Sequence, residues 1–308
     1  MKNKEPLILA VVVFFTLVTY YLVEPYAHHV MHKHVESEHF EYKDLAEFTP
    51  TTNVANGKEL VMSNCTACHS INVANMPAPM DAVTSAATYG VNPPDLSNAG
   101  VVYDAKYLAA FIADPAKAAN VSHKFNDTKM HPMPAYNWMQ PSEISDIVAY
   151  LQSIAVKAEE LTPALAFENA CGRCHAMGYE KWTQLGTKPT FKHKKDELAY
   201  DIKVIEYEDS IKAYMGKLPP DLSMYIRSRN EHFISTLVEN PQNHLAGTAM
   251  PRTGVSAETM EKVIEHMKDA GDTKRHEREE VGMKVMIYII IFAIFALLWK
   301  KQVWRDLH

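Results

Sequence analysis

The sequence predicts an all-α protein in which two similar helical units lie between two transmembrane helices. Three observations support this prediction: one series of local signals occurs twice, its apolar residues have helical spacing, and an apolar run stands near each end. The 308 residues suffice for about two domains of ordinary size. A hydrophobic content of 47% allows ordinary cores, and a net charge of −6 gives no reason to expect nucleic-acid binding.

The first predicted element is a membrane anchor near the N-terminus. Residues 6–23 form an uncharged apolar run that is long enough to cross the hydrocarbon core of a bilayer. A cleaved signal peptide is the alternative interpretation, but no small-x-small cleavage site follows the run. We therefore predict an uncleaved transmembrane helix within residues 1–25.

A linker rich in histidine is predicted over residues 26–54. By composition, its histidines are candidates for a metal or quinol site. Amphipathic histidines also suit a lipid headgroup surface or contacts with neighbouring subunits, and we favour that interpretation. The histidines concerned are His28, His29, His32, His34 and His39.

Two helical units with the same order of signals follow, over residues 55–156 and 160–272. Each has a helix ending in Cys-x-x-Cys-His, a Pro-Pro-Asp-Leu-Ser loop, a helix closed by Asp-Pro or Asn-Pro, a Met-Pro loop and an amphipathic final helix. Apolar residues recur at spacings of three and four in the final helices, which predicts that they form the cores. These residues are Ile144, Ile147, Val148, Leu151, Met260, Val263, Ile264 and Met267.

The second unit carries an insertion over residues 178–217, between its cysteine motif and its Pro-Pro loop. The insertion includes the charge-rich stretch KHKKDE at residues 192–197. A charge run of this kind indicates a solvated loop, and a surface for a partner is the alternative.

A second transmembrane helix is predicted over residues 283–301, with a cytoplasmic tail at 302–308. Residues 285–299 form an apolar run with no polar face, which argues against a buried core helix. Lys300, Lys301 and Arg305 form a positive cluster of the kind found on the cytoplasmic side. Both termini are thus expected in the cytoplasm, with the units in the periplasm of a bacterial inner membrane.

All four cysteines of the chain belong to two Cys-x-x-Cys-His strings. A thioredoxin-like pair needs no histidine after the second cysteine, and a zinc site made from these six residues would be unusual in ligand order and number. Cysteines three apart on a helical turn can both form thioethers to a porphyrin, and the following histidine then lies under the iron. The strings therefore predict two covalently bound c-type haems, at Cys65, Cys68 and His69 and at Cys171, Cys174 and His175, with zinc or disulfides as alternatives.

These motifs, taken in their order, resemble class I cytochrome c domains in tandem, over residues 55–155 and 165–270. The resemblance implies a distal methionine ligand before the last helix of each unit, at Met133 and Met250. Met250 is the only methionine in its loop, whereas Met130, His131 and Met139 lie near Met133, with His131 as the best alternative.

The same resemblance implies that a proline carbonyl in each Pro-Pro-Asp-Leu-Ser loop binds Nδ1 of the iron-ligating histidine. The candidates are Pro93 or Pro94 in the first unit and Pro219 or Pro220 in the second.

The second unit is also similar to cytochrome c1, in its string LPPDLSMYIRSR and in the membrane anchor that follows it. That similarity implies that Arg227 or Arg229 pairs with a haem propionate. A two-haem form with an additional N-terminal anchor resembles the type found in some epsilonproteobacteria. The extra first unit has no counterpart in the single-haem pattern, so the order of the two haems in electron transfer stays open.

The cytochrome c1 resemblance implies an electron carrier within a quinol:cytochrome c oxidoreductase, the cytochrome bc1 complex of the respiratory chain. Its partners would be cytochrome b, a Rieske iron-sulfur protein, and a soluble cytochrome c or terminal oxidase as acceptor, with no substrate chemistry of its own. A di-haem subunit of a cbb3-type oxidase, a di-haem peroxidase and a free-standing membrane electron carrier are the alternatives.

Overall fold

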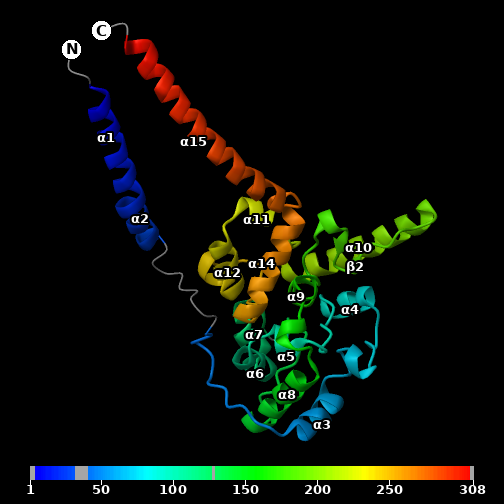
Figure 1. Ribbon diagram of the computed structural model, residues 1–308. Helices are drawn as coiled ribbons and strands as arrows, with labels where there is room; N and C mark the ends of the chain where they lie inside the picture. Colours follow the sequence, from blue (N-terminus) through cyan, green and yellow to red (C-terminus); the bar gives the residue numbers. More distant parts are fainter. Residues whose placement is uncertain (1–3, 32–40, 127–128, 306–308) are drawn as a thin grey trace.

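The computed structural model describes residues 4–31, 41–126 and 129–305 of the chain (Figure 1). Most of these residues are helical, which agrees with the predicted all-α class. The named strands within the described ranges, β1 (Trp182–Thr183) and β2 (Gly186–Thr187), form one short antiparallel hairpin.

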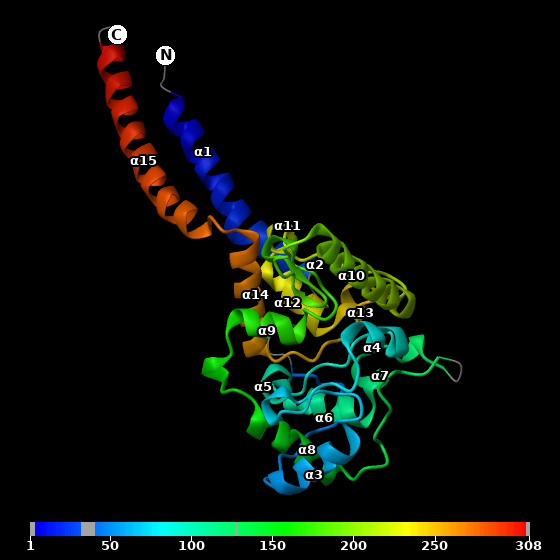
Figure 2. The ribbon, with the colours of Figure 1, turned by 90° about the vertical axis from the view of Figure 1, so that its right-hand side faces the viewer.

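The two terminal helices stand outside the helical body, and their free ends lie close together (Figures 1 and 2). The first is α1 (Glu5–Val18), which continues through the π-helical segment η1 (Thr19–Val23) into α2 (Glu24–Met31). The second is α15 (Arg275–Arg305). Neither α1 nor α15 has a buried residue, and both terminal segments are long and apolar enough to cross a membrane.

Two ion-pairing residues connect the free ends of these helices. Lys300 Nζ of α15 lies 2.7 Å from a carboxylate oxygen of Glu5 in α1. The observed helices extend beyond the predicted spans, because α2 continues to Met31 and α15 begins at Arg275. His28 and His29 of the predicted linker lie within α2, while His32, His34 and His39 lie outside the described residues.

The first helical unit runs from Val54 to Ile154, and its final helix packs on its first helix. Polar side chains begin its helices: Asn53, Asp81 and Asp104 each accept a hydrogen bond from a backbone N–H of the first turn. The elements are α3 (Val54–Asn64), η2 (Asn72–Ala74), α4 (Ala82–Tyr89), α5 (Ala99–Val102), α6 (Ala105–Ala113), α7 (Pro115–Ala118), η3 (Ser122–Lys124) and α8 (Pro141–Ile154).

The second helical unit runs from Pro163 to Gly271 and repeats the order of the first. Asn230 begins a helix as Asp104 does, and Pro241 begins a short helix as Pro115 does. The elements, with the preceding η4 (Ala158–Glu160), are α9 (Pro163–Ala170), η5 (Gly178–Glu180), α10 (Lys194–Met215), α11 (Tyr225–Ser228), α12 (Glu231–Glu239), α13 (Pro241–His244) and α14 (Ala257–Gly271).

The predicted core residues of the final helices are buried. All eight, four in α8 and four in α14, have relative exposures below 8%, so that prediction is confirmed. The core around α14 also includes Val102 and Tyr107 of the first unit and Tyr42 and Leu45 from the segment that precedes it. The two units therefore share one apolar core and pack against each other.

The insertion at residues 178–217 is not a solvated loop, so that expectation was wrong. It contains the β1–β2 hairpin and the 22-residue helix α10, which packs against α4 of the first unit (Figures 1 and 2). Tyr207 and Ile211, four residues apart on one face of α10, are fully buried together with Ala86. The many charged residues of α10 lie on its other faces. The prediction of a solvated loop was based on those charges and therefore missed the narrow apolar contact.

Candidate functional site

The first cysteine motif lies on a helical turn that continues α3. The N–H of Cys65 donates to Val61 O at 2.9 Å, and those of Cys68 and His69 donate to Cys65 O at 3.1 and 2.9 Å. These bonds keep the three side chains on one turn, as the spacing predicted.

The second motif has the same geometry at the end of α9. The N–H of Cys171 donates to Phe167 O at 2.8 Å, and those of Cys174 and His175 both donate to Cys171 O at 3.0 Å. Two equivalent turns thus present two cysteines and a histidine each.

Each motif histidine is oriented by a proline carbonyl. His69 Nδ1 lies 2.8 Å from Pro94 O, and His175 Nδ1 lies 2.8 Å from Pro220 O. A carbonyl can only accept, so Nδ1 carries the proton and Nε2 keeps a lone pair for a metal. Burial lowers the pKa of both imidazoles, although the bond to the proline carbonyl opposes that shift, and neutral imidazole is the form that ligates iron.

The Pro-Pro-Asp-Leu-Ser loops are fastened to the segments that follow the histidines. In the first unit, Leu96 N–H donates to Ser70 O at 2.9 Å, and Val73 N–H donates to Ser97 Oγ at 3.1 Å. The second unit repeats both bonds at the same lengths, from Leu222 N–H to Ala176 O and from Tyr179 N–H to Ser223 Oγ. This fastening explains why Pro94 and Pro220, rather than Pro93 and Pro219, face the imidazoles.

The four cysteine sulfurs form no disulfide, and the cysteines differ in how far burial perturbs them. Desolvation raises the pKa of Cys65 to about 11 and that of Cys171 to about 12. Zinc binding requires thiolates. Across residues 4–31, 41–126 and 129–305, moreover, no group of three or more His, Cys, Asp or Glu side chains is arranged to hold a metal ion. The geometry fits thioether attachment better than a zinc site.

The distal side of the first unit offers four candidate ligands in different settings. Met130 is 77% exposed, and Met139 is buried within the core of α8. Met133 is partly buried and packs against that core. His131 Nδ1 lies 3.0 Å from Met133 O, and its ring contacts Phe125. Met133 and His131 thus lie between the surface and the core, which is a position from which a side chain could ligate a haem iron.

The distal side of the second unit contains Met250, partly buried against the core that α14 shares with the first unit. The chain after it pairs with the first unit, because Arg252 N–H donates to Ala119 O at 2.9 Å and Ser256 N–H donates to Val102 O at 3.0 Å. Tyr103 and Val255 form an antiparallel bridge between these bonds. The first unit thereby fixes the methionine loop of the second.

Tyr107 of α6 secures the same loop. Its hydroxyl donates to Arg252 O at 2.7 Å, and its ring lies 1.8 Å from where a Cβ on Gly254 would be. Gly254 has φ +74°, a conformation that glycine adopts without strain. A side chain at this position would push the loop away from α6.

The two arginines that the cytochrome c1 resemblance suggested lie at the surface. Arg227 and Arg229 flank the end of α11, both exposed, and the Arg229 guanidinium lies 5.5 Å from the centre of the Phe233 ring. The sequence reasoning overlooked Arg173, between the cysteines of the second motif, whose Nη1 donates to Asn92 O of the first unit at 2.9 Å. The only feature of the sequence that could have drawn attention to Arg173 was its positive charge between the two cysteines of the second motif.

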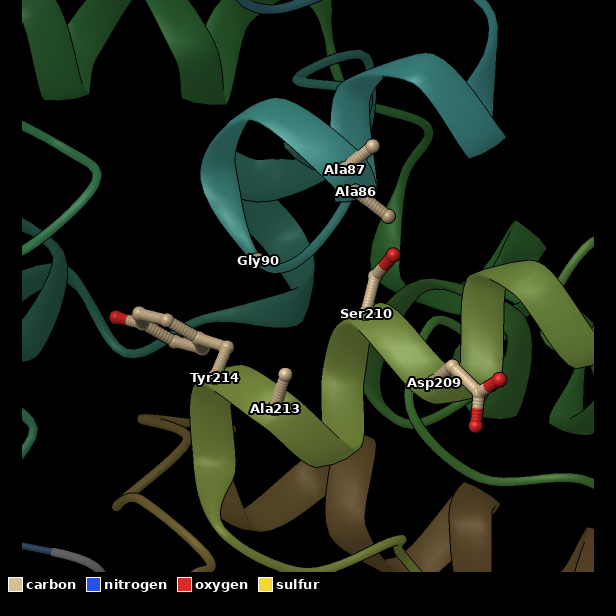
Figure 3. Close-up of a pocket in the computed structure, with 7 residues that line it drawn as sticks. All are labelled: Ala86, Ala87, Gly90, Asp209, Ser210, Ala213 and Tyr214. Carbon is tan, nitrogen blue, oxygen red and sulfur yellow. The ribbon is translucent and has the colours of Figure 1, made fainter.

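A groove of about 530 Å³ runs between α4 and α10 (Figure 3). The Ala86 side chain points toward Ser210 across it, while the Ala87 side chain and the Asp209 carboxylate point away. Gly90, at φ +86°, allows Tyr214 to approach closely, since an added Cβ would lie 2.3 Å from the Tyr214 ring. The groove is lined mainly by small residues together with Tyr214 and marks the contact of the insertion helix with the first unit.

Comparison with known proteins assigns the first unit. Residues 54–155 match the family model described as Cytochrome c, so this part of the chain is a cytochrome c domain, an electron carrier with covalently bound haem c. No curated protein matches the chain. A solved structure described as "Hyperthermophilic respiratory Complex III" matches at 22% identity over 51% of this chain and 79% of that chain, with a TM-score of 0.35. Similarity at that TM-score is too low to assign a fold or a role.

Proposed function

We propose that the chain is a membrane-anchored di-haem cytochrome c, built from two tandem class I cytochrome c domains. The observation that carries this proposal is the repetition, in the second unit, of the bonds that orient the histidine of the first. The 2.8 Å contact from histidine Nδ1 to proline carbonyl and the fastening of the loop behind it occur at both motifs. A cytochrome c domain has this arrangement in residues 54–155, and the second unit reproduces it.

Each unit would hold its haem through residues that the structure brings together. Cys65 and Cys68, or Cys171 and Cys174, would form the thioethers, and Nε2 of His69 and of His175 would ligate the iron, which supplies one-electron exchange when haem is bound. The proline carbonyls at Pro94 and Pro220 fix the ring orientation and increase ligand basicity.

Methionines would complete the two iron sites. Met133 and Met250 are partly buried against the cores of their units, in loops that precede the final helices. Ligation by histidine and methionine holds haem iron at a higher potential than two histidines would, which suits transfer to a high-potential acceptor. Arg227 or Arg229 would pair with a propionate of the second haem.

The shared core suits electron transfer between the two haems. The methionine loop of the second unit is hydrogen bonded to the first unit, so separation of the units would require breaking these hydrogen bonds. The two haems would therefore keep a fixed separation. A fixed separation allows electrons to pass within the chain without a diffusional step.

The terminal helices would anchor the chain in a bacterial inner membrane, with both termini in the cytoplasm and both haem units in the periplasm. The ion pair of Glu5 with Lys300 supports this topology, because it joins the outer ends of the two helices. Lys300, Lys301 and Arg305 form the positive cluster expected on the cytoplasmic side.

Within the respiratory chain, we assign the protein the role of the cytochrome c1 subunit of a quinol:cytochrome c oxidoreductase, of the epsilonproteobacterial di-haem type. It would take electrons from a Rieske iron-sulfur protein, beside cytochrome b, and pass them to a soluble cytochrome c or a terminal oxidase. The LPPDLSMYIRSR string and the anchor that follows the second unit support this role.

Purification from native membranes in mild detergent tests the role. We expect cytochrome b and a Rieske protein to co-purify with the chain in fixed proportion. Co-purification with the catalytic subunit of a cbb3-type oxidase would contradict the cytochrome c1 role, and reduction of hydrogen peroxide by the isolated protein would indicate a di-haem peroxidase. Purification as a single polypeptide with two haems would indicate a free-standing electron carrier.

A further inference from the structure

Arg173 belongs to the second cysteine motif, but its side chain reaches the first unit. Its Nη1 donates to Asn92 O at 2.9 Å. Asn92 stands two residues before Pro94, whose carbonyl binds His69 Nδ1 at 2.8 Å. A residue between the two cysteines of one motif therefore holds the loop that orients the histidine of the other.

Two tyrosines keep Arg173 in this position. The Tyr207 hydroxyl donates to Arg173 O at 2.9 Å and accepts from Asn92 N–H at 3.4 Å, and Tyr207 is fully buried. The Tyr103 hydroxyl donates to Asn169 O at 3.3 Å, and its phenolic oxygen interacts electrostatically with the guanidinium. Side chains from both units thus fix the position of the charge.

The charge of Arg173 is not neutralised by the groups that bind it. Its guanidinium donates to a neutral carbonyl, its Nε is buried without a partner, and no carboxylate within the described part of the chain forms an ion pair with it. Guanidinium stays protonated at all ordinary pH values. The guanidinium binds Asn92 O at 2.9 Å, two residues before the proline that orients His69, so its charge lies against the loop of the first motif.

We propose that Arg173 is a positioning residue for the haem of the first unit, which it acts on in two ways. It holds residues 92–94 against the second motif, and it places a fixed positive charge against the loop that orients His69, which raises the reduction potential of that haem. Reduction removes one positive charge from the iron, so a nearby cation favours the reduced state. The inference rests on the proposed function, in which each unit carries a haem.

Redox titration of the detergent-purified full-length protein, followed by haem absorbance, tests the proposal. In Arg173→Gln, which removes the charge and keeps an amide donor, we expect the reduction equilibrium constant of the first haem to fall about tenfold, or about 59 mV for one electron. In Arg173→Lys, which keeps the charge, we expect a fall of less than about threefold, about 28 mV on the same scale. Lys203→Gln, an exposed charge removal on α10, is the matched control and should leave the potential unchanged.

The step of the redox titration that belongs to the first haem is the one whose potential shifts in Met133→His. Should that variant not fold, it is the step that is absent from Cys65→Ala/Cys68→Ala. An unchanged first-haem potential in Arg173→Gln would overturn the proposal. An equal fall in the Gln and Lys variants would also overturn it, because charge would then not be the cause. The difference between the Gln variant and wild type should persist in 1 M salt, since buried charges are screened little, and its loss in salt would count against a buried charge.

Failure of this inference and failure of the proposed function give different results. A wild-type protein whose intact mass shows fewer than two haems contradicts the proposed function. A protein with two haems whose potentials do not respond to Arg173→Gln contradicts the inference alone.

Discussion

The two cysteine motifs are supported alike on the side of the histidine and differently on the side of the methionine. On the histidine side, both units use a proline carbonyl at 2.8 Å and a loop fastened by a bond of 2.9 Å. All of these bonds lie within one unit. The bonds that orient each histidine therefore lie within its own unit, and in the first unit Arg173 of the second unit holds the loop in addition.

On the methionine side, the segment after Met133 is bonded within its own unit, whereas the segment after Met250 is bonded to the other unit. Tyr136, just after Met133, donates from its N–H to Ile112 O at 3.1 Å and from its hydroxyl to Asn64 O at 2.9 Å, both in its own unit. The loop after Met250 is instead bonded to Val102 and Ala119 of the first unit. Under the proposed function, the second haem would depend on the first unit for the position of its distal ligand, and the following variants test that asymmetry.

Gly254→Ala should have the largest effect. The alanine Cβ would overlap the Tyr107 ring and must adopt φ +74°, so we expect a loss of about 2–5 kcal/mol of unfolding free energy, from about 1–2 kcal/mol of backbone cost and about 1–3 kcal/mol of overpacking. Urea denaturation measures this loss. Gly247→Ala is the control, because it has φ +79° and open space around its Cβ, and it should cost only the backbone contribution. Equal losses would show that Tyr107 does not hold the loop.

Met250→Ala and Met133→Ala should each remove a distal ligand. We expect the reduction equilibrium constant of the affected haem to fall about a hundredfold, or about 120 mV, because an exchangeable ligand replaces the thioether. The measurement is a redox titration with the near-infrared absorption of the iron–methionine bond. If Met133→Ala leaves that absorption intact while His131→Ala abolishes a haem ligand, His131 is the distal ligand of the first haem.

Tyr107→Phe should have a smaller effect that is confined to the second haem. It removes the bond to Arg252 O and leaves a buried carbonyl without that donor, at a cost of about 1–2 kcal/mol. Faster exchange of the Met250 ligand, measured by cyanide binding to the oxidised protein, is the expected sign. Cyanide binding at the first haem should keep its wild-type rate, and equal acceleration at both haems would contradict the asymmetry.

Asp44→Asn should have the smallest effect. Asp44 pairs with the buried Arg252 guanidinium at 2.9 Å, but its carboxylate is 58% exposed, so the pair contributes at most about 1 kcal/mol. A fall in the thermal midpoint of only a few degrees is expected. A fall comparable with that of Gly254→Ala would mean that this ion pair, and not Tyr107, holds the Met250 loop.

Sequence patterns predicted what each unit contains and missed what passes between the units. Helical spacing identified the buried residues of α8 and α14, and the cysteine spacing predicted the two turns. These features depend on residues close together in the chain. The contact of Arg173 with Asn92, the pairing of Tyr103 with Val255 and the packing of Tyr207 on α4 join residues far apart, and no local pattern encodes them.

The haem count of the purified protein tests the central claim, two haem units of equal design, most directly. Intact-mass analysis of wild type should show two covalently bound haems. Cys171→Ala/Cys174→Ala should retain one, because the first motif carries its own cysteines, histidine and proline carbonyl. A wild-type protein with a single haem, whose haem is unaffected by that double substitution, would contradict the claim.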